Sequence, residues 1–79
     1  MSSSIPLSAM SAGQHGIVSE YAEFDELSQR LMHMGLVEGT EIEFIRRAPS
    51  GDPIEIKVLG YALSLRSSEA ERLLISVSE

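Results

Sequence analysis

The chain has 79 residues and no cysteine, so it can hold one small hydrophobic core and has no disulfides, thiolate nucleophiles or cysteine-ligated metal centres. Twelve acidic residues outnumber six basic ones, and the resulting net charge of −6 comes without a basic stripe that would bind a phosphate backbone or anionic lipids. Composition therefore argues against nucleic-acid binding and direct membrane insertion, and it predicts one globular domain in a reducing compartment, the cytoplasm.

The first residues of the chain predict a tail and a strand. Residues 1–6 are rich in serine and predict a flexible N-terminal tail, which leaves residues 7–79 as the domain. The start of the chain has no basic region and no long apolar run, so we expect no signal peptide. Gly13 and Gly16 frame a turn, after which residues 17–22 ("IVSEYA") predict the first strand.

The stretch "FDELSQRLMHMG", residues 24–35, predicts the clearest helix of the chain. Asp25 is the expected N-cap, and Gly35 is the expected left-handed residue that ends the helix. The helix has an apolar stripe with spacings of 3, 4 and 3 residues, which we expect to face the core: Phe24, Leu27, Leu31 and Met34.

A histidine between two methionines, Met32, His33 and Met34, raises the question of a soft-metal site. Neighbouring side chains on a helix point about 100° apart, so these three cannot converge on one ion while the segment stays helical. His15 is the only other histidine, and no spacing in the chain requires a metal. We therefore expect a core Met34, an exposed His33, and neither a metal ion nor a cofactor.

Two alternating segments follow the helix and predict a β-hairpin. Residues 40–47 ("TEIEFIRR") and 54–60 ("IEIKVLG") place apolar and charged side chains on opposite faces, and the intervening "APSGDP" contains turn residues. A register that keeps both apolar faces together places Glu43 opposite Lys57.

The remaining segments complete a small barrel. Residues 61–66 ("YALSLR") follow a bend at Gly60, "SSEAERL" predicts one helical turn capped by Ser67 or Ser68, and residues 73–77 ("LLISV") predict the last strand. Five short strands avoid exposed edges by closing on themselves. The predicted fold is mainly β: a small SH3-like five-stranded barrel with one α-helix between strands 1 and 2 and a short helical turn before the last strand.

Four segments in order carry a family resemblance: "LSAMSAGQHGIV", "RLMHMGLVEGT", "APSGDPIEIKVLGYALSLRSSEA" and "LISV". This set, from Leu7 to Val77, resembles the FeoA family, small accessory proteins of bacterial ferrous-iron uptake. The resemblance implies an SH3-like barrel in the cytoplasm that works with FeoB, a membrane iron transporter with a cytosolic GTPase region. Departures are mild: Glu38 stands where the family usually has proline, and Met10 and Met34 replace leucines.

Other classes of function fit the residues less well. We expect no enzyme, because the acidic pairs Glu41/Glu43 and Glu69/Glu71 lie on predicted solvated faces and the chain has no phosphate-binding loop motif. Its four aromatic residues are too few to line a polyproline groove. The alternative is a regulatory module related to the C-terminal domain of metal-dependent repressors, acting by protein contact or weak metal binding. The favoured function is a cytosolic accessory protein that docks on FeoB and modulates its GTPase or gating.

Two surfaces are candidates for that contact. The first is the exposed end of the helix with its turn, where Met32 would add an adaptable apolar contact. Its candidate residues are Arg30, Met32, His33, Leu36 and Val37. The second is the basic end of the hairpin, with Arg46 and Arg47 and with Lys57 nearby.

Overall fold

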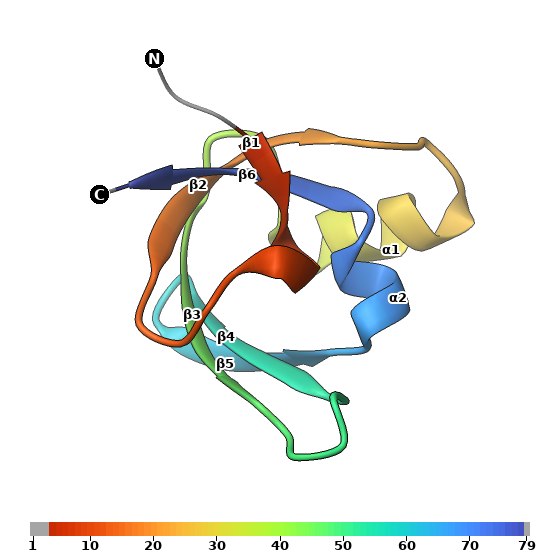
Figure 1. Ribbon diagram of the computed structural model, residues 1–79. Helices are drawn as coiled ribbons and strands as arrows, with labels where there is room; N and C mark the ends of the chain where they lie inside the picture. Colours follow the sequence, from red (N-terminus) through yellow and green to blue (C-terminus); the bar gives the residue numbers. More distant parts are fainter. Residues whose placement is uncertain (1–3, 79) are drawn as a thin grey trace.

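A computed structural model describes residues 4–78 of the chain. Six antiparallel strands form one sheet in the order β1-β6-β2-β3-β4-β5, which curls around a single core (Figure 1). In chain order the elements are β1 (Ser4–Pro6), the 3-10 turn η1 (Leu7–Ala9), β2 (His15–Tyr21), α1 (Glu26–His33), β3 (Glu41–Arg47), β4 (Ile54–Val58), β5 (Tyr61–Leu65), α2 (Ser67–Ala70) and β6 (Leu73–Ser78). The predicted mainly β architecture, with one helix after the first long strand and a helical turn before the last strand, is confirmed.

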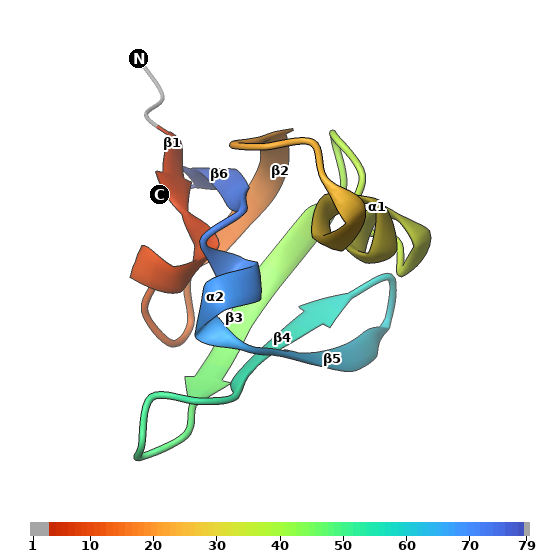
Figure 2. The same ribbon diagram turned by 90° about the vertical axis from the view of Figure 1, so that its right-hand side faces the viewer.

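Two details of the predicted barrel are wrong. The sheet has six strands rather than five, because Ser4–Pro6 pair with β6. A flexible tail was predicted for residues 1–6, but its last three residues form strand β1. Residues 1–3 lie outside the described part. The sheet is also not closed by hydrogen bonds, because β1 and β5 stand at its two ends. The turn η1 and helix α2 contact each other and cover the opening between these ends (Figure 2).

Helix α1 is shorter than predicted at both ends, but its caps are those expected. The carboxylate of Asp25 accepts a hydrogen bond from the N–H of Ser28 at 2.9 Å, which satisfies one free donor of the first turn. Gly35 has a φ of 103°, as predicted for the residue that ends the helix. Phe24 was expected in the core and is instead 78% exposed, because it precedes the N-cap and so lies outside the helical stripe.

The hairpin of β3 and β4 has the predicted register, with Glu43 opposite Lys57. Its inward side chains join those of the other strands, of α1 and of the turns in one core, where burial of each large apolar side chain contributes about 1.5–3 kcal/mol. The buried apolar residues are Leu7, Met10, Val18, Tyr21, Leu31, Leu36, Ile42, Phe44, Ile54, Ile56, Val58, Leu65, Ala70, Leu73 and Ile75.

The predicted cap of α2 is wrong. Arg66, not a serine, is the N-cap residue, and its N–H donates to Oε1 of Glu69 at 2.8 Å. The N–H and the hydroxyl of Ser67 both donate to Oδ1 of Asp52 at 2.6 Å. The serine expected to cap the helix therefore joins α2 to the tip of the β3–β4 hairpin.

Gly16 tests how closely β2 and β6 pack. A Cβ at this position would overlap Cγ2 of Ile75 and lie 2.9 Å from the carbonyl oxygen of Ser76. We expect Gly16→Ala to lower the free energy of unfolding by about 1–3 kcal/mol, as overpacking does, in urea denaturation. His15→Ala, at an exposed side chain of the same strand, is the control and should change it by less than about 0.5 kcal/mol. Equal losses in the two variants would contradict this account.

Candidate docking surfaces

The end of α1 is built by backbone hydrogen bonds that turn the chain back toward the core. The N–H of Met34 bonds to the carbonyl of Arg30 at 3.2 Å, and the N–H of Leu36 bonds to that of Leu31 at the same distance. The left-handed Gly35 between them allows this reversal. The side chain of Leu36, the residue after Gly35, is therefore directed inward.

This local geometry separates the residues predicted for the first surface. Leu36 was expected to be exposed and is instead 0% exposed within the core, so it cannot contact a partner. Its carbonyl accepts a hydrogen bond of 2.6 Å from the hydroxyl of Tyr21, and burial raises the pKa of Tyr21 to about 12. Met32 is half-buried and packs against the core. The predicted side chains that do remain exposed are those of Arg30, His33 and Val37.

Two residues that the sequence reasoning missed extend this surface. Leu59, in the turn between β4 and β5, is 69% exposed and has a φ of 52°, a left-handed conformation that a leucine rarely adopts. Its side chain lies over Gly35, where an added Cβ would come within 2.8 Å of Cδ1. Tyr61 is also exposed, and its hydroxyl donates to the carbonyl of Met34. We call Val37, Leu59 and Tyr61 the α1-end patch.

A sequence signal for Leu59 existed. Two-residue hairpin turns with positive φ values favour Asn and Gly, so the "VLG" stretch places an apolar residue where a small polar one would be unstrained. A leucine in this conformation costs about 1–2 kcal/mol relative to an unstrained residue. Strain of this kind at an exposed apolar side chain makes the position a candidate contact.

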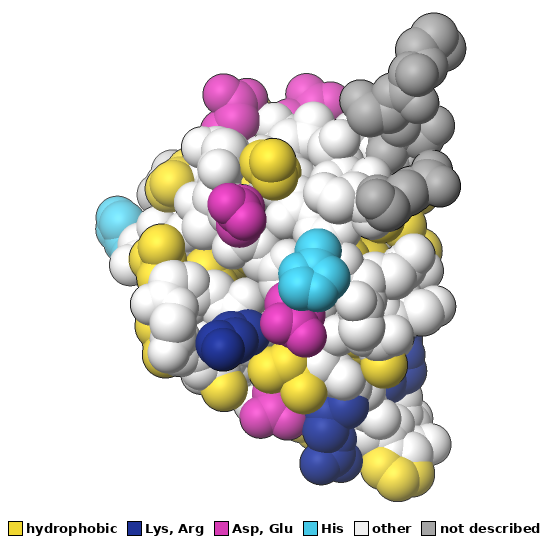
Figure 3. All heavy atoms as spheres, turned by 90° about the vertical axis from the view of Figure 1, so that its left-hand side faces the viewer, with side chains coloured by type: hydrophobic (Ala, Val, Ile, Leu, Met, Phe, Trp, Pro, Cys, Tyr) yellow, Lys and Arg dark blue, Asp and Glu magenta, His cyan; other side chains and the backbone are white. Residues whose placement is uncertain are grey.

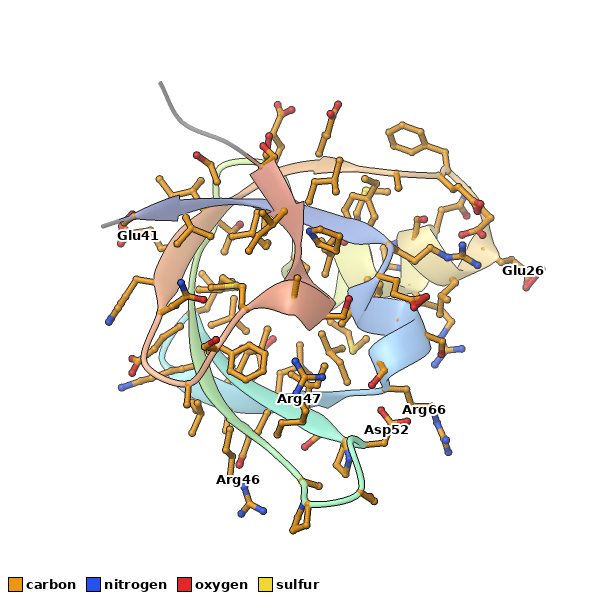
Figure 4. All side chains as sticks on the ribbon, in the orientation of Figure 1. Glu26, Glu41, Arg46, Arg47, Asp52 and Arg66 are labelled. Carbon is orange, nitrogen blue, oxygen red and sulfur yellow. The ribbon has the colours of Figure 1, made fainter. Side chains whose placement is uncertain are left out.

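One of the two arginines of the second predicted surface, Arg47, stabilises the fold. The guanidinium of Arg47 donates to the carbonyls of Ser8 at 2.6 Å and Met10 at 3.4 Å, and it lies 5.4 Å from the ring centroid of Phe44. Arg47 thus ties β3 to η1. Arg46 points away from the body of the molecule, at the end opposite α1 (Figure 4). The structure therefore does not bring the two predicted surfaces together.

Among residues 4–78, no three His, Asp or Glu side chains are grouped so that they could hold a metal ion. Within the same range neither helix is long and apolar enough to cross a membrane. The face formed by β2 and β3 mixes acidic, basic and hydrophobic side chains (Figure 3).

Comparison with known proteins agrees with this geometry. A curled, incompletely closed β-sheet whose opening is covered by short helical segments defines a small SH3-like domain. The FeoA domain matches residues 5–77, and the chain belongs to the FeoA family. A FeoA-like protein from Clostridium acetobutylicum is 37% identical, with a TM-score of 0.92 over 100% of this chain and 92% of that chain. FeoA of Stenotrophomonas maltophilia, a procaryotic SH3 domain protein solved in complex with zinc, is 26% identical, with a TM-score of 0.80 over 100% of this chain and 96% of that chain.

Two further matches are a fusion protein and a transcriptional repressor. A fusion protein of Fe(2+) transport protein A and the Fe(2+) transporter FeoB, from Porphyromonas gingivalis (strain ATCC BAA-308 / W83), is 27% identical over 67 residues. The match covers 85% of this chain and 8% of that protein. A manganese-dependent transcriptional repressor has a TM-score of 0.87 over 95% of this chain and 37% of that chain, at 17% identity, which shows likeness of fold alone. The predicted FeoA resemblance and SH3-like fold are confirmed.

The adjacent residues Leu36 and Val37 separate packing from surface exposure. We expect Leu36→Ala to lower the free energy of unfolding by about 2–5 kcal/mol, because it removes a fully buried side chain. Val37→Ala, at a 45% exposed position, is the matched control and should change it by less than about 0.5 kcal/mol. Guanidinium denaturation of both variants measures this, and a small loss in Leu36→Ala would show that the turn is misplaced.

Acid denaturation tests the link between Asp52 and α2. Hydrogen bonds from the hydroxyl and the N–H of Ser67 hold the pKa of the Asp52 carboxyl below its ordinary value of 3.8. The unfolded chain therefore takes up this proton first, so the stabilisation is complete above about pH 4 and is lost as pH falls through the folded-state pKa. We expect Asp52→Asn to flatten the fall in stability below about pH 4 in urea melts at stepped pH.

Two further features sharpen that measurement. Ser67→Ala removes one of the two donors and should flatten the same acid limb by a smaller amount. Part of the slope should persist in every variant, because the N–H of Ser28 lowers the pKa of Asp25 in the same way at the start of α1. An acid limb in Asp52→Asn as steep as that of the wild type would show that the link contributes nothing.

Proposed function

We propose that this chain is a cytosolic accessory protein of ferrous-iron uptake that docks on the cytosolic region of a FeoB-type transporter and modulates its GTPase or gating. The observation that carries the proposal is the fusion protein of P. gingivalis, in which a FeoA part and a FeoB transporter share one polypeptide. A short tether raises the effective concentration of two parts to about the millimolar range, so even a weak contact between them is populated. The FeoA domain of this chain would make the same contact with a FeoB-type transporter.

Docking alters a transporter only through a difference in affinity between two of its conformations. A tenfold preference for one conformation shifts the equilibrium by about 1.4 kcal/mol. The chain suits this role because its core is one contiguous cluster that supports the surface. The alternative, a regulatory module like that of the repressors, would use the same kind of protein contact, and its support is the likeness of fold.

The α1-end patch is the surface that we assign to this contact. It combines an exposed aliphatic side chain, Leu59, with an exposed aromatic one, Tyr61, and aromatic residues dominate the binding energy of many interfaces. Arg30 and His33, which belong to the predicted first surface, are exposed on α1. The end of the hairpin, with Arg46 and Arg47, is the second candidate.

A charge placed in the α1-end patch tests this assignment. We expect Leu59→Glu to weaken binding to the purified cytosolic region of the FeoB-type transporter by about tenfold or more, because a buried hot-spot contact would be lost and a charge desolvated. Calorimetric titration in the presence of GDP and of a non-hydrolysable GTP analogue measures it. Phe24→Glu is the matched control: its side chain is 78% exposed and lies at the other end of α1.

The outcomes separate the surface from the function. Binding by Leu59→Glu equal to that of the wild type would move the contact to the hairpin, where Arg46→Glu should then weaken it. If the wild-type chain binds in neither nucleotide state, the accessory role on the transporter is wrong. Circular dichroism confirms that each variant is folded.

A further inference from the structure

Strand β5 is an unprotected edge of the sheet. It pairs with β4 on one side and stands at the end of the strand order. Edge strands are ordinarily protected by charges, proline, bulges or shortness. The opposite edge, β1, follows this rule, because it has three residues and ends at Pro6. Residues 59–65 ("LGYALSL") contain neither a charged residue nor a proline, and the pairing of β5 with β4 runs without a register shift.

The hairpin geometry determines which backbone groups face the open side. The turn before β5 has positive φ at both of its residues, 52° and 84°, and Val58 pairs with Tyr61 across it. In such a hairpin the closing pair exchanges its backbone hydrogen bonds, and bonded and unbonded pairs then alternate. The N–H and C=O groups of Ala62 and Ser64 therefore point away from β4. Both residues are small and exposed, so side chains do not obstruct these groups.

A groove of about 590 Å³ lies at the end of this edge, between β5 and the two helices. Figure 2 shows α1 and α2 above β5. Figure 4 shows Asp52 beside Arg66, the residue that precedes α2. Its volume lies within the range of about 300–1,000 Å³ that is typical of ligand sites. The groove is lined by Arg30, Met34, Asp52, Pro53, Ser64, Leu65, Arg66 and Glu69.

The charges of the groove are unequally engaged. The carboxylate of Asp52 accepts both hydrogen bonds of Ser67, and that of Glu69 accepts the N–H of Arg66. The side chain of Arg30 is 70% exposed and lies 4.0 Å from Glu69, the outer limit of an ion pair. Among residues 4–78 the guanidinium of Arg66 makes no hydrogen bond or ion pair. The two guanidinium groups therefore keep N–H donors that face the groove, whereas one oxygen of each carboxylate is already hydrogen-bonded within the domain.

We propose that β5 is a strand-addition site for an extended peptide segment that carries an acidic side chain. The main chain of the segment bonds to the free N–H and C=O groups of Ala62 and Ser64, and its carboxylate meets the guanidinium groups of Arg30 and Arg66. The backbone bonds supply affinity, and the charge-assisted bonds to arginine select the sequence. This site goes beyond the proposed function, because neither its ligand nor its test depends on the transporter.

Nuclear magnetic resonance titration with two synthetic peptides tests the proposal. The probe is TVEVEVT, with blocked ends, and the matched control is TVKVKVT. We expect the acidic peptide to protect the Ala62 and Ser64 amides from hydrogen exchange and to bind at least threefold more tightly than the basic one. The titration is run at about 150 mM salt, where the Debye length is near 8 Å and the net charge of −6 is largely screened.

Variants of the full chain give the matched controls. Ala62→Pro removes an N–H that does not bond to β4, and it should abolish the protection of the Ser64 amide, whereas Ala62→Val keeps the N–H and should bind as the wild type does. Arg30→Glu should remove the preference for the acidic peptide, and Arg46→Glu, at the other end of the molecule, should leave it intact. Each variant is checked for the wild-type amide spectrum outside β5.

Three results would overturn the proposal. The first is an absence of protection at Ala62 and Ser64 at millimolar acidic peptide. The second is binding of the basic peptide as tightly as the acidic one. The third is protection in the peptide-free protein that rises with protein concentration, which would identify a second copy of the chain as the occupant of the edge.

Discussion

A short sheet that must enclose a core without closing on itself is the constraint on which the rest of this structure depends. Six strands curl far enough to bury one face, but among residues 4–78 β1 and β5 each pair with a strand on one side only. The opening is covered by η1 and α2, whose buried Leu7 and Ala70 belong to the same core as the strands. The links that hold these covering segments, Ser67 to Asp52 and Arg47 to Ser8, are hydrogen bonds between segments far apart in the sequence.

Both proposed surfaces include residues of β5, the strand at one end of the sheet. The α1-end patch lies where the turn after α1 meets the turn between β4 and β5, and Tyr61 joins them through the carbonyl of Met34. The free edge of β5 begins at the same tyrosine and runs toward α2. A rigid patch and an open strand edge on neighbouring parts of one small domain allow two modes of protein contact, one through side chains and one through the main chain.

Expectations for the surface depended on knowing which way the chain turns after α1. Periodicity placed Leu31 in the core correctly, whereas Met34, also expected there, is only partly buried against it. It wrongly assigned Phe24 to the core, because the apolar spacing continues past the point where the cap ends the helix. Leu36 lay beyond the helix, where no period applies, and the left-handed glycine before it directs its side chain inward. Leu59 could be noticed in sequence only as an unusual turn residue, and its closeness to Gly35 is a long-range contact that no local pattern encodes.

The sequence by itself determined the alternation of apolar residues in the strands, the caps of α1, the register of the β3–β4 hairpin and membership of the FeoA family, because each depends on local spacing or on motifs in order. The tertiary structure decided the number of strands, the open edge of β5, the burial of Leu36, and the use of Ser67 and Arg47 as links rather than as a cap and a surface charge. These features depend on which segments meet across the core. Which segments meet is decided by backbone hydrogen bonds between strands that are distant in sequence and by the space between those strands. Neither produces a periodic pattern of residues that could be recognised in the sequence.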